Sequence, residues 1–369
     1  MKKLAILGAS YLQKPLVKKA IEMGVEVHCF AWDNSFAVCR DIADYFYPIS
    51  VLEKDLILNK CKEIQINGIV TIATDICIPT IAYVANQLNL IGNSEKSAYI
   101  STNKFEMREA FLKNNVSSPK SIKVENINEI NCILNYPLIV KPTDSSGSRG
   151  VTKVFSKNEL SMAIERAIEN SIEKKAVIEE FIEGVEVSVE SISWKGNHTI
   201  ITITDKVTTG TPYFVELEHH QPSQLNKEIQ DKIKKETIKA LDALKIEYGA
   251  SHAEFKITPD GKVYIIEVGA RMGGDFIGSH LVQLSTGYDF LKAVIEIALN
   301  EFSQPIVEKE MFSGIYFLSK KTERLLPYFE KENDFEVQKE YLNKNLVNIT
   351  NSNDRSGYII YSANQKIIL

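Results

Sequence analysis

The sequence predicts a mixed protein, α/β over about its first ninety residues and α+β beyond them. Strand-like apolar runs alternate with helical stretches up to about residue 92, which is typical of a small parallel sheet with helices on both faces. Farther on, apolar runs are joined by tight turns, as in the hairpin over Glu254–Glu267, which indicates antiparallel sheet. A chain of 369 residues is long enough for two or three domains.

Composition excludes several classes of protein. Hydrophobic residues make up 44% of the chain and charged residues 25%, as in ordinary globular proteins. A net charge of −5 without a dense basic stripe argues against nucleic-acid binding, and no apolar run is long enough to span a membrane. The five cysteines are scattered, which favours a reducing compartment, and Leu4–Leu7 is too short for a signal peptide. We expect a cytoplasmic protein with neither nucleic-acid nor membrane partners and leave a homodimer open.

The first domain is predicted to contain a short parallel sheet. Gly8 ends its first strand, but Ser10 and Gln13 stand where a dinucleotide-binding fingerprint needs glycine, so a dehydrogenase is the least favoured function. A helix follows to about Met23. The expected strands are Leu4–Leu7, Val25–Phe30, Gly68–Ile72 and Asn89–Ile91.

Polar residues follow two of these strands, at the edge where open sheets bind ligands. They are Trp32, Asp33 and Asn34 after one strand and Asp75 after another. We favour structural caps for them and leave a role in substrate binding open.

Two lysines precede a loop of small residues in the chain. Asn103 can cap a helix while Glu106 reaches back, which places Lys104 at the first helical position. Lys141 ends the expected strand Tyr136–Val140 and precedes a Ser/Gly loop over residues 143–150. The loop lacks the Gly-Lys-Ser/Thr of a Walker A motif, but its backbone amides are suited to closing over phosphates. A plain surface hairpin is the alternative.

The rest of the chain alternates strands and helices around one polar stretch. Residues 207–224 are expected to form an irregular loop, because they are polar and contain Gly210, Pro212 and Pro222. The expected helices are Glu159–Asn170, Asn226–Lys245 and Tyr288–Leu299. The expected strands are Val151–Phe155, Ala176–Phe181, Glu186–Trp194, His198–Lys206, Ser313–Leu318 and Gly357–Tyr361.

The hairpin over Glu254–Glu267 carries one carboxylate on each strand. With a turn at Thr258–Gly261, Glu254 faces Ile265 and Glu267 is its diagonal neighbour on the same face, roughly 7–8 Å away. A slip by one residue would put the two carboxylates on opposite faces. Two carboxylates on one face can share a hard divalent cation, and Arg271 can sit over an anion held by it. An ordinary hairpin with exposed acids is the alternative.

Four signatures, in order, resemble those of the ATP-grasp superfamily of carboxylate–amine ligases. They are Lys104 after its cap, Lys141-Pro with the Ser/Gly loop, the hinge-like segment Ile178–Glu186, and the Glu254, Glu267 and Arg271 segment. Within the superfamily, Ser251–Lys256 and Glu267-x-x-x-Arg271-x-x-Gly274 are most similar to the L-amino-acid ligases. The first ninety or so residues resemble the preceding domain of the biotin carboxylase and carbamoyl phosphate synthase branch. Gly269 departs from the pattern, since many members have a metal-binding Asn there.

The resemblance implies a fold and a reaction. It implies a pre-ATP-grasp domain at 1–92, a small subdomain with the lid at 93–175, a large subdomain with the metal site at 176–303, and a C-terminal α+β segment at 304–369. Two α+β subdomains would clasp ATP. The enzyme would activate a small carboxylate, with an amino acid on at least one side, as an acyl phosphate and couple it to an amine. The implied cofactors are ATP and Mg²⁺ or Mn²⁺, and the implied partners are a small-molecule carboxylate and an amine.

The resemblance also implies roles for individual residues. Glu254 and Glu267 would hold the metal, while Arg271 and Lys141 would act in catalysis. The nucleotide would be bound by Lys104, Lys141, Ser146, Gly147, Glu179, Glu180, Ile182 and Glu186, with Glu179 at the adenine amino group and Glu186 at the ribose. The substrate side is predicted from the sequence itself: the long polar stretch Thr208–Gln224 is expected to line the amino-acid pocket with Glu216, His219 and His220, and Gly274 is a further candidate.

Simpler interpretations of three histidines stay open. His252 is as well explained as an interior histidine, and His219 and His220 as ordinary loop residues.

Competing functions are bicarbonate activation or a purine-pathway carboxylation, and a nucleotide-binding protein without catalysis. The intact Glu254, Glu267 and Arg271 argue against the last. The sequence does not identify the acyl donor or the amine.

Overall fold

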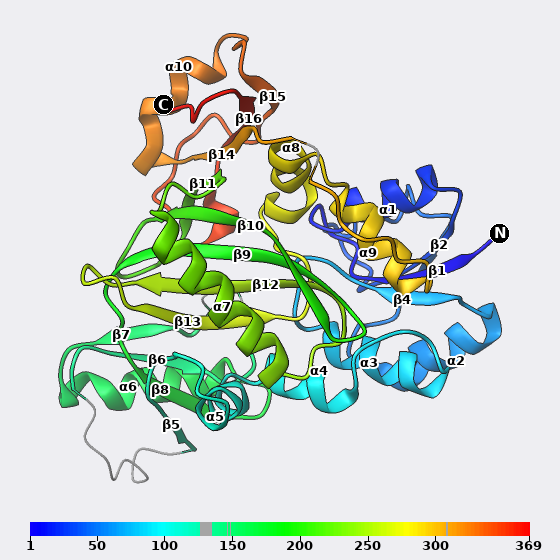
Figure 1. Cartoon of the computed structure of the whole chain (residues 1–369), viewed down its shortest axis with the longest axis horizontal. Coiled ribbons are helices and arrows are strands. Elements are labelled where there is room, and N and C mark those ends of the chain that lie inside the picture. The colour runs from blue at the N-terminus through cyan, green and yellow to red at the C-terminus, as the bar shows by residue number, and fades with distance from the viewer. Residues whose placement is uncertain (126–134, 146, 148, 308) are drawn as a thin grey trace.

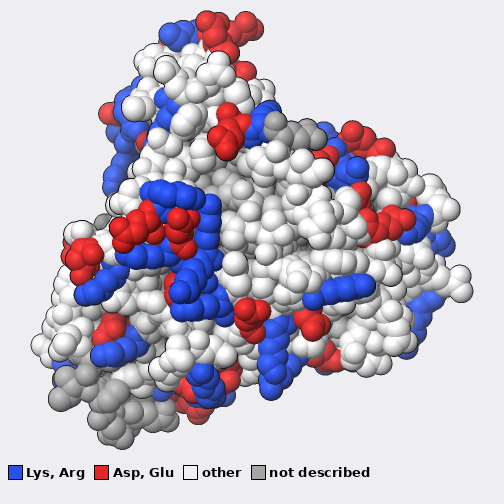
Figure 2. Space-filling view, viewed as in Figure 1, with Lys and Arg blue, Asp and Glu red and all other residues white. Residues whose placement is uncertain are grey.

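The structure is a computed structural model that describes residues 1–125, 135–145, 147, 149–307 and 309–369. It contains a four-stranded parallel sheet, a second four-stranded sheet and an eight-stranded antiparallel sheet (Figure 1). The predicted mixture of α/β and α+β structure is therefore confirmed. Among the described residues, no helix is both long and apolar enough to cross a membrane. Positive and negative side chains are interspersed on the face shown in Figure 2.

The N-terminal sheet has the strand order β3-β2-β1-β4. One expectation for it was wrong: Asn89–Ile91 forms no strand, because Asn89 adopts a left-handed φ of 52° after a helix and the Leu90 N–H bonds back to Ala85. A short strand that we did not predict, β3, pairs with β2. The elements are β1 (Lys3–Leu7), α1 (Lys14–Glu22), β2 (Glu26–Phe30), β3 (Tyr45–Tyr47), α2 (Lys54–Ile64), β4 (Gly68–Val70) and α3 (Ile78–Gln87).

A helix from much later in the chain completes this domain. Helices α2 and α3 cover one face of the sheet, and α1 with α9 (Phe290–Ala298) covers the other. The approach of α9 is so close that a Cβ on Gly68 would lie 2.3 Å from the carbonyl oxygen of Ala298. The N-terminal sheet is thus fixed against the part of the chain that carries the Glu254–Glu267 hairpin.

The small sheet has the order β5-β8-β6-β7 and packs against helix α6. Helices α4 and α5 lead into it from the N-terminal domain (Figure 1). The elements are α4 (Glu95–Thr102), α5 (Lys104–Lys113), β5 (Ser121–Val124), β6 (Leu138–Pro142), β7 (Thr152–Val154), α6 (Lys157–Glu169) and β8 (Ala176–Glu180).

The large sheet has the order β13-β12-β9-β10-β11-β14-β16-β15, with α7 packed on one face. The C-terminal strands β14 to β16 therefore continue the sheet that carries the hairpin. The elements are β9 (Val185–Trp194), β10 (Asn197–Thr208), β11 (Glu216–Gln221), α7 (Lys227–Ala243), β12 (Tyr248–Ile257), β13 (Val263–Gly269), η2 (Ile277–Leu281), α8 (Val282–Thr286), β14 (Phe312–Leu318), η3 (Lys320–Leu325), α10 (Leu326–Phe329), β15 (Glu336–Tyr341), η4 (Ser352–Asp354) and β16 (Gly357–Ala363).

The expectation of an irregular loop over residues 207–224 was wrong. Strand β11 lies within it, in the middle of the large sheet between β10 and β14. Its sequence, Glu-Leu-Glu-His-His-Gln, is too polar to suggest a buried strand. Polar side chains are accommodated there because each face of the strand meets charged or hydroxyl partners, such as Lys206 on one side and Tyr361 on the other.

Candidate active site

The two hairpin carboxylates face each other directly. Glu254 on β12 is paired with Glu267 on β13, so both side chains leave the same face of the sheet. The predicted diagonal arrangement was wrong, because the turn is one residue longer: Thr258 bonds to Lys262 and not only to Gly261. A bulge at Ile266 then adds a residue to β13 and returns Glu267 to the face of Glu254.

Each of these carboxylates is neutralised by a lysine. The Lys104 Nζ lies 2.7 Å from Glu267 and also donates to the carbonyl oxygen of Ser145 at 2.8 Å. The Asn103 side chain caps α5 as predicted, by accepting from the backbone N–H groups of Phe105 and Glu106, and so places Lys104 at the start of the helix. The Nζ of Lys206 lies 2.6 Å from Glu254.

Lys206 is a site residue that sequence reasoning missed. Its ammonium group also lies 3.2 Å from Glu186 and 3.6 Å from Glu216. Burial opposes its charge, but the three surrounding carboxylates outweigh burial and raise the pKa of Lys206 well above its ordinary value. In the sequence, Lys206 follows a strand-like run with alternating threonines and belongs to no recognisable motif. Its role follows only from its contacts in the folded structure.

A second buried cluster surrounds Lys141. Its Nζ lies 2.6 Å from Oε2 of Glu179, and Arg108, another residue missed from the sequence, lies 2.9 Å from Oε1 through its Nε. Burial is the main cause that lowers the pKa of Lys141, while Glu179 opposes it. Although ion-paired, Oε1 of Glu179 is buried without a hydrogen bond from any described residue, so it keeps an acceptor site open.

The predicted nucleotide residues surround one cavity of about 230 Å³. Ile139, Phe181 and Ile266 give it apolar walls, and charged side chains also line it. The predicted residues on its lining are Lys104, Lys141, Gly147, Glu179, Glu180, Ile182, Glu186, Glu254, Glu267 and Arg271. Ser146, predicted for the lid, lies outside the described residues.

A larger cavity of about 880 Å³ adjoins the first. Residues from both cavities form a shared wall, namely Asp75, Gly147, Val151, Phe214, Glu216, His252, Glu254 and Arg271. A group bound in one cavity therefore lies next to a group bound in the other, with Arg271 between them.

The structure separates the predicted substrate residues. Glu216, His219 and Gly274 line the large cavity, whereas His220 does not. His220 points to the other face of β11, where its ring nitrogens contact Tyr361 and Glu218. Its placement at the substrate site was wrong, because successive residues of a strand point to opposite faces.

A register shift puts Glu216 and His219 on one face. Thr208 pairs with Glu216 but Val207 pairs with Glu218, so Leu217 is the extra residue of a bulge. Both ring nitrogens of His219 are buried without a hydrogen bond from the described residues. Burial is the main cause that lowers the pKa of His219 to about 4, so the ring is neutral at pH 7.

The C-terminal segment contributes a cation that the sequence did not reveal. Arg355, two residues before β16, lies 2.8 Å from Asp275 and 3.2 Å from Glu216, and its guanidinium lies 3.7 Å from the centroid of the Phe317 ring. Asp275 and Glu216 both line the large cavity. Burial raises the pKa of Glu216, followed in size by the opposing effect of Lys206. Arg355 is not itself on the lining of this cavity, but it pairs with two carboxylates that are.

Glu190 on β9 holds the segment that follows β13. Glu190 accepts from the Gly273 N–H at 3.0 Å and contacts Nδ1 of His252, while Nε2 of His252 lies 3.4 Å from Glu254. His252 is therefore an interior histidine with partners on both nitrogens, which also borders both cavities. Burial opposes its charge, but Glu190 outweighs burial and raises the pKa of His252 to about 9.

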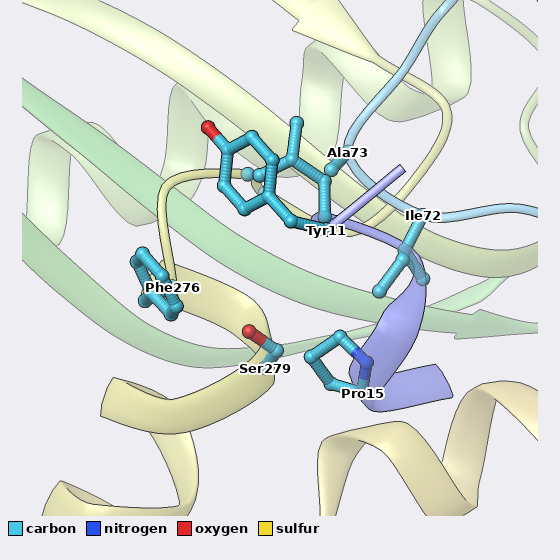
Figure 3. Close-up of a pocket in the computed structure, with 9 residues that line it drawn as sticks. Tyr11, Pro15, Ile72, Ala73, Phe276 and Ser279 are labelled. Atoms are coloured by element: carbon cyan, nitrogen blue, oxygen red, sulfur yellow. The ribbon is translucent and has the colours of Figure 1, made fainter. Parts of the chain in front are cut away.

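The N-terminal domain meets this segment directly. Figure 3 shows Tyr11 and Ala73 beside Phe276 and Ser279, around a small cavity of about 10 Å³. The Tyr11 and Phe276 ring centroids are 6.4 Å apart. Asp75 reaches farther and accepts from Arg271 at 2.8 Å. Asp75 is therefore at the site, whereas Asp33 is exposed and paired with Arg40.

The residues of the smaller cavity fit a nucleotide with a divalent cation. The free acceptor on Glu179 suits an exocyclic amino group, and the apolar walls suit a flat base. Within the described part of the chain, no three or more His, Cys, Asp or Glu side chains converge as a ready metal site. Two facing carboxylates with phosphate oxygens are nonetheless the ligand type that Mg²⁺ prefers.

Comparison with known proteins agrees with this geometry. Residues 134–279 match the ATP-grasp domain. The chain is 28% identical over 273 residues to the alanine–anticapsin ligase of Bacillus subtilis strain 168, covering 64% of this chain and 57% of that ligase. It is 26% identical over 261 residues to the carbamoyl phosphate synthase large chain of Caldanaerobacter subterraneus, covering 70% of this chain and 24% of that protein. The matched part thus spans little more than half of the first relative and a quarter of the second.

One solved structure has the same fold over nearly its whole length. The L-amino acid ligase from Bacillus licheniformis superposes with a TM-score of 0.82 at 24% identity, covering 99% of this chain and 94% of that one. At this identity the likeness concerns the fold.

Proposed function

Because residues 134–279 form an ATP-grasp domain, we propose that this protein is an ATP-dependent ligase that joins a small carboxylate to an amine, with an amino acid on at least one side. The observation that carries the proposal is the wall shared by the two cavities. Arg271, His252 and Glu254 border the nucleotide-sized cavity on one side and the larger cavity on the other. A phosphoryl donor and its acceptor would meet across these residues.

The cofactors are ATP and Mg²⁺, which supply the phosphoryl group and neutralise its charge. A carboxylate is a poor acylating agent, because oxide is a poor leaving group. When a carboxylate oxygen bonds to the γ-phosphorus and the bond to ADP breaks, the carbonyl carbon gains phosphate as a leaving group. The amine then forms the C–N bond, loses a proton and displaces phosphate.

The side chains serve this transfer by position and charge. Glu254 and Glu267 would hold the cation, which frees Lys206 and Lys104 from these carboxylates to contact phosphate oxygens. Lys141 would contact phosphate from the opposite strand, held by Glu179. Arg271 would stabilise the charge that develops on the acyl phosphate and on the tetrahedral carbon.

We place the amino-acid substrate in the large cavity. Asp275 and Glu216, which Arg355 pairs with, line this cavity together with Arg271, and this set of charges suits a zwitterion. We assign Glu216 and His219 to the substrate side, because both line this cavity.

The decisive experiment measures phosphate release with a panel of amino acids, alone and in pairs, and identifies the amide by mass spectrometry. Phosphate release that requires two amino acids, with a dipeptide of matching mass, is the expected result. Glu254→Gln serves as the inactive control. No amide from any pair, with nucleotide still bound, would contradict the ligase assignment.

Bicarbonate activation is the second candidate, since the chain has a carbamoyl phosphate synthase among its relatives. Phosphate release that depends on bicarbonate and not on any amino acid would favour it.

We also propose that the protein is located in the cytoplasm and forms a homodimer. Cys29, Cys39, Cys61 and Cys77 are free and buried, which suits a reducing compartment.

A further inference from the structure

The loop after β4 carries an aspartate from the N-terminal sheet into the carboxylate site. Asp75 lines both cavities. Its loop is anchored, because the Ala73 N–H donates to the carbonyl oxygen of Met272 at 3.0 Å while Ala73 holds a left-handed φ of 63°. A residue with a Cβ holds this conformation only where its surroundings impose it. Asp75 therefore reaches the site from a fixed position.

The two oxygens of Asp75 have different surroundings. Oδ2 accepts from Nη2 of Arg271 at 2.8 Å. Oδ1 is buried and receives no hydrogen bond from any residue that the structure describes. Burial opposes ionisation, yet Arg271 outweighs it and lowers the pKa of Asp75 below its ordinary value, so the carboxylate is charged at neutral pH. A buried charged oxygen of this kind is costly unless a cation or donor completes its surroundings.

Oδ1 of Asp75 lies beside Gly269, a residue of β13 that has no side chain. Gly269 follows Glu267 by two residues, so its missing side chain would face the same cavity as the Glu267 carboxylate. A Cβ placed on Gly269 would lie 2.7 Å from Oδ1 of Asp75 and 2.9 Å from Cζ of Arg271. Asp75 thus occupies the space of a short side chain at position 269. Asp75 lines the same cavity as Glu254 and Glu267.

We propose that Asp75 supplies an oxygen ligand, from the N-terminal domain, to the divalent cation held by Glu267. The inference rests on the proposed function, because the cation accompanies the nucleotide. Oxygen ligands from carboxylates are what Mg²⁺ and Mn²⁺ prefer, and Oδ2 keeps its hydrogen bond to Arg271 while Oδ1 binds the cation. The cation then links the N-terminal sheet to the hairpin.

The test is Mn²⁺ binding in the presence of the ATP analogue AMP-PNP, followed by electron paramagnetic resonance. Asp75→Ala is expected to weaken Mn²⁺ binding about tenfold or more, while AMP-PNP binding without metal stays near that of the unchanged protein. Asp33→Ala is the matched control, since Asp33 follows strand β2 of the same sheet but pairs with Arg40. Asp33→Ala should bind Mn²⁺ like the unchanged protein. Equal Mn²⁺ affinity in Asp75→Ala and the unchanged protein would overturn the inference.

A rescue variant separates metal binding from orientation of Arg271. Asp75→Ala combined with Gly269→Asn returns an oxygen to the same place and should recover Mn²⁺ affinity. If Asp75 only orients Arg271, Arg271→Ala and Asp75→Ala will bind Mn²⁺ equally well and the inference fails. Asp75→Asn, which keeps the shape, replaces Asp75→Ala if thermal melts show that the latter is unfolded. If the unchanged protein binds neither AMP-PNP nor Mn²⁺ together with AMP-PNP, the proposed function itself fails.

Discussion

The ammonium group of Lys206 lies 2.6 Å from the carboxylate of Glu254, and the ammonium group of Lys104 lies 2.7 Å from the carboxylate of Glu267 on the facing strand. Each lysine thus places a positive charge where a metal ion would neutralise the same carboxylate. Nucleotide and cation would replace these pairs by new ones, with the lysines on phosphate oxygens. The site is arranged for an exchange of partners between fixed charges.

Removing either hairpin carboxylate should abolish turnover. Glu254→Gln and Glu267→Gln keep the shape of the side chain but lose the charge that holds the cation, so we expect phosphate release to fall roughly a hundredfold or more. Circular dichroism should show an unchanged fold. Release near that of the unchanged protein at saturating Mg²⁺ would exclude these residues as metal ligands.

Lys141→Ala and Glu179→Ala should each weaken ATP binding more than substrate binding. The two side chains form a buried pair at 2.6 Å, so loss of Glu179 leaves Lys141 without this partner, and loss of Lys141 leaves Glu179 paired with Arg108 alone. Calorimetry on both single variants and the double variant should give non-additive losses. Lys113→Ala is a suitable control, because Lys113 is exposed and pairs at 3.5 Å with Glu109, which lines neither cavity. Unchanged nucleotide affinity in both variants would refute the nucleotide site.

Adjacent histidines offer a matched test of the substrate cavity. His219→Asn and Glu216→Gln should raise the KM for the amino substrate with little change for ATP, because both residues line the large cavity. His220→Asn should leave both KM values unchanged, since His220 faces Tyr361. If His219 and His220 variants behave alike, the substrate is bound elsewhere.

His219 should make stability depend on pH. Its pKa of about 4 in the folded protein is below the ordinary 6.5, so the unfolded chain binds the proton more readily. Stability from this group is complete above about pH 6.5 and is lost as the pH falls towards 4, by about 3 kcal/mol at most. Urea unfolding at pH 7 and pH 5 should show a smaller loss for His219→Phe than for the unchanged protein. An equal loss would mean that His219 is charged or exposed in the fold.

Local patterns in the sequence predicted the parts of the site that lie on continuous motifs. Lys104 follows a helix cap, Lys141 ends a strand before small residues, and Glu254 and Glu267 share a hairpin. The predicted register failed by one residue at the turn, and only the bulge at Ile266 restored the shared face. A bulge depends on tertiary contacts, here the Arg108 hydrogen bond to the Ile266 carbonyl, and has no marker in the sequence.

Residues that act through distant contacts were harder to predict. Lys206, Arg108 and Arg355 each meet partners far away in the chain, such as Glu254, Glu179 and Asp275. Strand β11 was missed because its polar residues match no period of buried side chains. Its burial depends on the neighbouring strands β10 and β14, which a single sequence does not place.

The packing of α9 against Gly68 limits where the chain can be cut into independent domains. One face of the N-terminal sheet is partly covered by a helix that lies more than two hundred residues later in the chain than the other elements of this domain, as the shared core of Leu16, Phe290 and Val294 shows. A fragment ending near residue 92 would keep α1 but leave the part of that apolar face beneath α9 open to water. Swapping this domain between relatives would require exchanging α9 with it. During synthesis, the core of the first sheet cannot be completed until the last third of the chain, which contains α9, has been made.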